Sequence, residues 1–128
     1  MTRTPLTPPE LLDAAREMLA GAPARGLGER SRIAAFLARQ ALERRLTELW
    51  SSRQETAGLG RSSGRSQLIC LRTYLNGDVE LAQEIRYAWV ALSNACHYHA
   101  YDLTPTTAEL SDLINTVARF VARPSRRP

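Results

Sequence analysis

Lysine is absent from this chain of 128 residues, although 17 basic residues, all of them arginine, give it a formal net charge of +4. Codon bias in a GC-rich genome is the simplest explanation of this absence. The functional alternative is that the planar guanidinium group of arginine suits bidentate contacts with phosphate. A pI near 9.7 permits binding to nucleic acid but does not establish it.

Cysteine and long apolar runs are also scarce. The two cysteines, Cys70 and Cys96, are too few for a disulfide framework, so we expect reduced thiols in a cytoplasmic protein. No apolar run is long enough to cross a bilayer, which predicts no membrane association. Three acidic residues interrupt the N-terminal segment, so it has no apolar core typical of a signal peptide: Glu10, Asp13 and Glu17.

The length and composition are those of one globular domain. A chain of 128 residues with 44% hydrophobic and 23% charged residues can bury a core without disulfides or metal. We expect a single domain over residues 7–122. Residues 1–6 are predicted to be a flexible tail, and residues 123–128 a flexible, arginine-rich one.

Charge is unevenly distributed along the chain. Residues 29–72 contain nine arginines and four glutamates, a net charge of +5. Residues 78–112 contain six acidic residues and one arginine, a net charge of −5, and residues 113–128 contain four arginines and no acid. These segments could neutralise each other inside the fold or across a dimer interface.

The apolar spacing predicts two N-terminal helices. The first begins at Thr7, which has the form of a capping box with Glu10, and ends at Gly21. The second is long, over about residues 29–52, with a wide apolar face and its arginines outside that face. The predicted apolar face consists of Ile33, Phe36, Leu37, Ala41, Leu42, Leu46, Leu49 and Trp50, and the arginines are Arg32, Arg39, Arg44 and Arg45.

Three further helices are predicted after a flexible loop at residues 53–64. The third helix covers about residues 66–75 and ends at Asn76-Gly77. Asp78 caps the fourth, which is expected to reach about residue 100. The fifth starts either at the capping box Thr106–Glu109 or at Thr104-Pro105. Without any strand alternation, these elements predict an all-α fold, a five-helix antiparallel bundle.

Residues 86–102 hold both histidines, three of the four tyrosines and one of the two cysteines, and any site chemistry is expected here. At about 100° per residue, one face of this helix is predicted to join the core, and a second stripe lies 80–120° away from it. The core face consists of Leu81, Ile85, Ala88, Trp89, Leu92, Cys96 and His99. The stripe that could meet a ligand consists of Arg86, Ser93 and His97, with roughly 16 Å of rise from Arg86 to His97.

Metal binding and thiol catalysis are weak alternatives for this segment. His97 and His99 are two residues apart, so on a helix they point apart and cannot share an ion. Cys96 and His99 could share one with Cys70, but this spacing matches no usual zinc pattern, and we predict neither metal nor cofactor. An apolar face raises the pKa of a thiol, which argues against Cys96 as a nucleophile and favours a space-filling role.

Two short motifs resemble those of the HEPN domain superfamily. The segment from Ala38 to Glu43 resembles its Gln-x-x-Glu region, and residues 94–102 resemble its Arg-x4-6-His segment. The small residue, tyrosine and acid that follow His99 are similar to those in toxins of this superfamily that are paired with nucleotidyltransferases. The resemblance covers roughly residues 8–122, including the number and order of the helices.

The resemblance implies a helical bundle that forms a homodimer. In active members of the superfamily, an arginine and a histidine of each protomer form a metal-independent RNA-cleaving site at the dimer cleft. The histidine transfers a proton at the ribose 2′-hydroxyl, and the arginine stabilises charge on the phosphate. Here Asn94 stands where the superfamily has that arginine before His99, and the nearest arginine is Arg86.

Three functions follow from these observations. The first is a non-catalytic, dimerising HEPN-like module that binds RNA, a nucleotide-type ligand or a protein partner encoded nearby. The second is an endoribonuclease of a toxin–antitoxin or defence system, with His97 or His99 as acid/base and Arg86 as a substitute arginine. The third is a helical interaction protein without nucleic acid. We favour the first, with binding residues Arg86, Ser93, Asn94, His97 and Tyr101.

Overall fold

A computed structural model describes residues 5–21, 27–52, 54–75, 78–97 and 105–123. Within these ranges the chain is all-α and contains no strand, which confirms the predicted class. No helix in the same ranges is long and apolar enough to span a membrane. The elements are α1 (Pro8–Ala20), α2 (Leu27–Ser51), the 3₁₀-helix η1 (Gln54–Arg61), α3 (Gly64–Tyr74), α4 (Val79–Cys96) and α5 (Thr107–Ala122).

The helix starts follow the predicted caps. The Thr7 N–H donates to the Glu10 carboxylate over 2.8 Å, and the Glu10 N–H donates back to the Thr7 hydroxyl oxygen over 3.4 Å. The Thr7 N–H and the Thr7 hydroxyl both donate to the Glu10 carboxylate and lower the pKa of this carboxyl, because they favour its charged form. Thr106 and Glu109 form the second capping box, at 3.1 and 3.0 Å, so α5 uses this start rather than Thr104-Pro105. Asp78 caps α4 as predicted.

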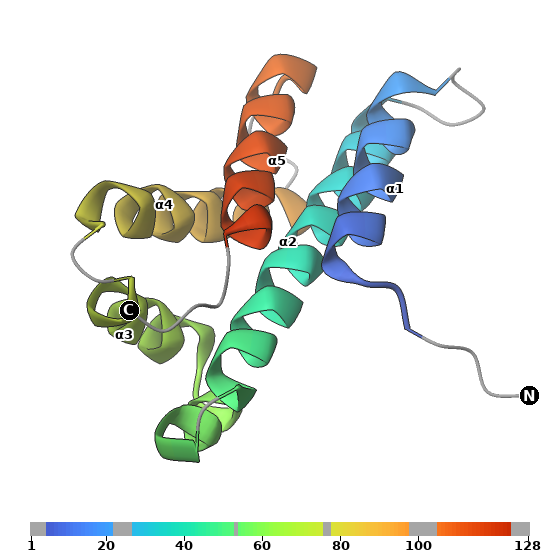
Figure 1. Cartoon of the computed structure of the whole chain (residues 1–128). Helices are drawn as coiled ribbons and strands as arrows, with labels where there is room; N and C mark the ends of the chain where they lie inside the picture. Colours follow the sequence, from blue (N-terminus) through green and yellow to red (C-terminus); the bar gives the residue numbers. More distant parts are fainter. Residues whose placement is uncertain (1–4, 22–26, 53, 76–77, 98–104, 124–128) are drawn as a thin grey trace, which may run out of the picture.

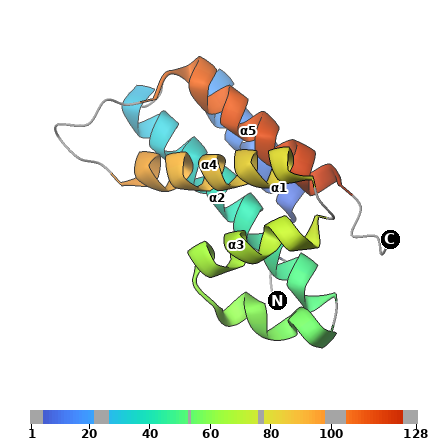
Figure 2. The ribbon, with the colours of Figure 1, turned by 90° about the vertical axis from the view of Figure 1, so that its left-hand side faces the viewer.

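The helices form two groups around α2. In the first, α1 runs antiparallel to α2, and α5 packs on both of them (Figure 1). In the second, α3 and α4 lie side by side and antiparallel, as both views show (Figure 2). Because α4 packs across α2 and α5 rather than along them, the helices are not all antiparallel neighbours.

The core is centred on α2, which contacts α1, α4, α5 and η1. Its alanines allow neighbouring backbones to approach closely, while larger side chains of every α-helix fill the remaining space. The largest fully buried side chains are Trp50, Phe120, Leu42, Leu46, Leu71, Ile85, Leu92, Leu110, Ile114 and Val117.

Two residues of α2 differ from the predicted faces. Phe36 was assigned to the apolar face, but 48% of its surface is exposed. Arg45 was placed outside that face, but it is buried. Its guanidinium lies over the Phe120 ring, 5.8 Å from the centroid, and donates to the Arg123 carbonyl oxygen over 2.9 Å. The end of α5 therefore covers Arg45, while the carboxylate that pairs with its charge belongs to Glu48 of α2 itself, at 3.7 Å.

Two further predictions, of a loop and of a helix end, were also wrong. The segment predicted as a flexible loop contains η1, which is held by the Thr56 hydroxyl donating to the Trp50 carbonyl oxygen over 2.8 Å. Helix α4 ends at Cys96, with His97 as its C-cap, and not near residue 100. The predicted helix end at Asn76-Gly77 lies outside the described residues.

Candidate functional site

Helix α4 presents the predicted core face. Ile85, Ala88 and Leu92 are completely buried, whereas Trp89 and Cys96 are half-buried at one edge of this face. Ala82 is also buried and was missed, because alanine gives little apolar signal on a helical wheel.

The predicted ligand residues fall into three environments. Arg86, Asn94 and His97 are exposed. Ser93 is half-buried, and its hydroxyl oxygen has no hydrogen-bond partner among the described residues. His99 and Tyr101 lie outside the described residues, so their predicted roles remain predictions. Arg86 and His97 share one side of α4, but roughly 16 Å of helical rise separates them and prevents a direct contact.

A polar cluster joins α4 to α2 around Trp89. The Trp89 indole N–H and the Arg39 Nε–H both donate to the same Glu43 carboxylate oxygen, each over 3.2 Å. The Arg39 guanidinium also lies over the Trp89 ring, 5.9 Å from its centroid. These contacts satisfy the indole N–H and position α4 on α2, so Glu43 and Arg39 have a structural function here.

Cys96 borders this cluster but is poorly suited to catalysis. Burial raises the pKa of its thiol, the nearby Arg39 guanidinium opposes that shift, and the Glu43 carboxylate adds to it. Because the net shift is upward, the thiol stays protonated at neutral pH and is a weak nucleophile. This agrees with the space-filling role predicted for Cys96.

Gly64 allows α3 to approach Trp89. A Cβ atom at this position would lie 2.7 Å from Trp89 Cζ2, which is closer than non-bonded carbon atoms come. The contact also sets the register of the two antiparallel helices, because it places the first turn of α3 beside Trp89 of α4. Close packing at this point depends on glycine.

We expect the Gly64→Ala substitution to lower the free energy of unfolding by about 1–3 kcal/mol, because the added methyl group forces the indole or α3 to move. Gly58→Ala is the matched control, since a Cβ atom at that position would meet no atom within 4 Å and the expected change is below about 0.5 kcal/mol. Urea unfolding followed by far-UV circular dichroism measures both. Equal stability of the two variants would contradict the close packing of Trp89.

Three arginines line the outer seam between α3 and α4. Arg65 and Arg72 are exposed on α3, and Arg86 is exposed on α4. On α3 both arginines lie about 100–120° from the core residue Leu71, on the same side of it as Gly64, which lies against Trp89 of α4. Around the axis of α4, Trp89 and Arg86 lie on the same side of Ile85, with Arg86 farther round. Because Trp89 contacts α3, Arg86 lies on the α3 side of α4. We call Arg65, Arg72 and Arg86 the arginine seam.

The guanidinium groups of the arginine seam are available to a ligand. None of the three has a hydrogen-bond or ion-pair partner among the described residues. Arg65 and Arg72 are about 10 Å apart in helical rise, and the register set by Gly64 and Trp89 places Arg86 beside the same stretch of α3. Exposed Ile69 lies between the two arginines of α3, and exposed Val90 lies one turn after Arg86.

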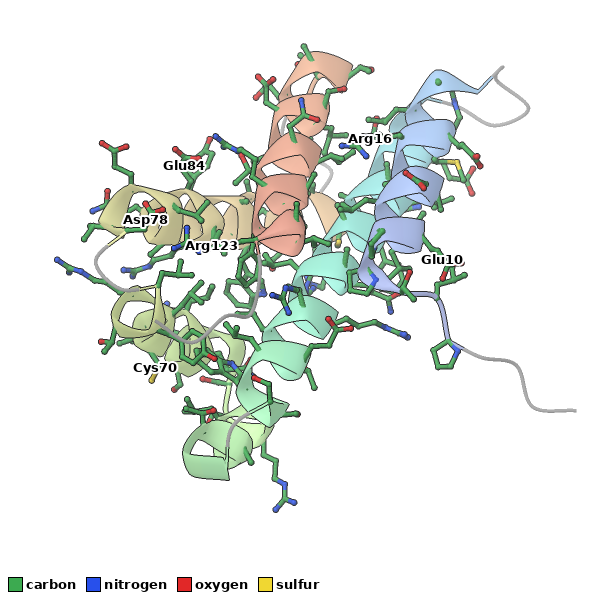
Figure 3. The ribbon with its side chains drawn as sticks, viewed as in Figure 1. Glu10, Arg16, Cys70, Asp78, Glu84 and Arg123 are labelled. Carbon is green, nitrogen blue, oxygen red and sulfur yellow. The ribbon has the colours of Figure 1, made fainter. Side chains whose placement is uncertain are left out.

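The opposite flank of α4 is acidic. Here α4 and α5 form a groove of about 480 Å³, which we call the acidic groove. Glu84 forms an ion pair with Arg119, whereas Glu80 and Asp112 have no such partner among the described residues. At the start of α4, Asp78 and Arg123 pair at 2.9 Å (Figure 3). The groove is lined by Glu80, Gln83, Glu84, Tyr87, Asp112, Leu113, Thr116 and Arg119.

Within the described residues, no group of three or more His, Cys, Asp or Glu side chains is arranged to hold a metal ion. No known protein family, curated protein or solved structure matches the chain. The fold class, the arginine seam and the acidic groove are therefore the observations on which a function can be argued.

Proposed function

We propose that this protein is a non-catalytic helical module that binds RNA through the arginine seam. The observation that carries the proposal is the clustering of three exposed and unpaired guanidinium groups on one side of the α3–α4 pair. Several arginines elsewhere are engaged within the fold, among them Arg39, Arg45 and Arg123. Exposed guanidinium groups that have no partner within the fold can form hydrogen bonds and ion pairs with the phosphate groups of a nucleic-acid backbone.

Single-stranded RNA suits this surface better than a duplex. The seam follows two antiparallel helices and presents Ile69 and Val90 among its arginines, so unstacked bases can make apolar contacts while phosphates meet the guanidinium groups. A nucleotide-type ligand would use the same groups with fewer phosphate contacts. A protein partner encoded nearby would have to be acidic.

The HEPN-like assignment is part of this proposal. It is supported by the order of the helices and by the placement of Glu43 of α2 against α4, since the Glu43 carboxylate accepts from the Trp89 indole N–H. It implies a five-helix bundle, a homodimer and a cytoplasmic location. Asn94, exposed in the last turn of α4, stands where active members have arginine, which supports binding without cleavage.

The alternative function is metal-independent cleavage of RNA. It is favoured by the exposure of His97 at the C-cap of α4, where a substrate can reach the imidazole. Arg86 is too far along α4 to act on the same phosphate within one protomer. An RNase of this kind would therefore need an arginine from elsewhere beside His97.

One experiment separates binding from cleavage. Labelled single-stranded RNA is titrated with the protein in EDTA, and both fluorescence anisotropy and RNA length are measured. We expect saturable binding that weakens with salt and RNA that stays intact with wild type and with His97→Ala alike. Absence of binding at low salt would overturn the proposal, and metal-free cleavage that His97→Ala abolishes would establish the alternative.

A further inference from the structure

The flank of α4 that faces α5 already holds organic cations, which are supplied by the chain itself. Asp78 pairs with Arg123 over 2.9 Å, and farther along α4 the Glu84 carboxylate pairs with the Arg119 guanidinium (Figure 3). The Thr116 hydroxyl oxygen accepts a second hydrogen bond from Arg119, over 3.2 Å. As α4 proceeds, its partners on α5 come earlier in the chain, so the two helices run in opposite directions along this flank.

Glu80 and Asp112 are left out of this pairing. Both carboxylates line the acidic groove and are exposed, and neither has an ion-pair partner among the described residues. Glu80 lies one turn before Glu84 on α4, whereas Asp112 lies two turns before Arg119 on the oppositely directed α5. The two unpaired carboxylates therefore lie toward opposite ends of the groove.

The remaining lining of the acidic groove suits an aliphatic chain. Tyr87 and Leu113 both line it, and 69% of the surface of Tyr87 is exposed, so this ring can contact methylene groups and attract an ammonium group. From Glu80 to Tyr87, α4 rises by roughly 10 Å. The volume of about 480 Å³ lies within the range of sites for small organic molecules.

We propose that the acidic groove binds a linear aliphatic diamine or polyamine whose terminal ammonium groups are about 10 Å apart. One ammonium group pairs with Glu80 and the other with Asp112, while the methylene chain covers Tyr87. Three carboxylates and one guanidinium give the charged lining a net charge of −2, which a ligand with two ammonium groups neutralises. This proposal rests on the groove alone and not on the proposed binding of RNA.

Isothermal titration calorimetry of the RNA-free protein at low salt compares three ligands. Octamethylenediamine has two ammonium groups at the required separation, putrescine has two that are closer together, and octylamine has one on a chain of the same length. We expect saturable, one-to-one binding of octamethylenediamine, at least about 5-fold tighter than that of either other amine. No saturable binding, or equal affinity for octamethylenediamine and octylamine, would overturn the proposal.

Removal of the two unpaired carboxylates should weaken this binding. The double variant Glu80→Gln/Asp112→Asn is expected to bind octamethylenediamine about 10-fold more weakly than wild type. The matched control is Asp13→Asn/Glu17→Gln, which removes two exposed carboxylates from α1, a helix that does not line the groove, and should stay within about 2-fold of wild type. Equal losses in the two double variants would mean attraction by net charge alone, and the site would be refuted.

The Arg119→Gln variant should change the affinity in the opposite direction. It frees the Glu84 carboxylate and removes the cation that competes with the ligand, so octamethylenediamine should bind about 3-fold more tightly. Damage to the fold cannot produce such a gain, and circular dichroism verifies the helical content of every variant. Unchanged or weaker binding by this variant would contradict a cation site at the groove.

A peptide of the same charge tests the other class of occupant. Arg-Gly-Gly-Arg, blocked at both ends, should bind at least about 5-fold more weakly than octamethylenediamine, because two long side chains and a flexible backbone must be ordered. If the peptide binds more tightly, and the Glu80→Gln/Asp112→Asn variant loses that binding, the groove accepts a protein segment and the assignment to a diamine is overturned.

Discussion

Trp50→Ala is expected to lower the free energy of unfolding by about 3–5 kcal/mol, a larger loss than we expect from the other substitutions proposed for this chain. The side chain is 1% exposed, packs edge-on against Tyr74 with centroids 5.2 Å apart, and donates its indole N–H to the Gln67 side-chain oxygen over 3.1 Å. Its removal leaves a cavity and an unpaired amide where α2 meets α3.

Phe36→Ala is the matched control for Trp50→Ala. Phe36 is an aromatic residue of the same helix, but 48% of its surface is exposed, so its removal should cost less than about 1 kcal/mol. Urea unfolding monitored by far-UV circular dichroism gives both values, because this signal does not depend on tryptophan. Similar losses in the two variants would contradict the placement of Trp50 in the core.

Replacing Arg65, Arg72 and Arg86 together with glutamine is expected to weaken binding of single-stranded RNA by about 100-fold, on the basis of roughly 1 kcal/mol for each guanidinium–phosphate contact. All three side chains are exposed, so the fold should keep its stability within about 1 kcal/mol. Anisotropy titration at low salt measures the loss.

The control for this triple variant must lose the same charge elsewhere. Arg16, Arg44 and Arg119 lie on α1, α2 and α5 and are engaged with Asn115, with the Leu6 carbonyl oxygen and with Glu84, respectively. The corresponding triple glutamine variant should bind RNA within about 5-fold of wild type, because only diffuse electrostatics change. Equal losses in the two triple variants would indicate attraction by net charge alone.

Local signals predicted much of the fold. The capping boxes at Thr7 and Thr106 and the N-cap at Asp78 depend on residues three positions apart, so the sequence reveals them directly. The burial of Arg45 and the exposure of Phe36 could not be predicted, because α1, α4, α5 and η1 all contact α2, and a helical wheel cannot tell which neighbour covers which residue.

The candidate site was predicted only in part. Arg86 was identified by its position beside the core face of α4, and it is exposed. Arg65 and Arg72 joined it only when the register of α3 against α4 was known, and that register depends on Gly64 beside Trp89. The signal in the sequence was two arginines seven residues apart on either side of Ile69, which is exposed. Only the position of α4 beside α3 showed that these arginines lie next to Arg86.

The dependence of RNA affinity on salt tests the arginine seam most directly. The logarithm of the association constant is plotted against the logarithm of salt concentration for wild type and for the variant lacking Arg65, Arg72 and Arg86. Loss of three phosphate contacts on a single strand should make the slope less negative by about 2, whereas the control triple variant should retain the wild-type slope. Identical slopes for wild type and the seam variant would contradict RNA binding at this surface.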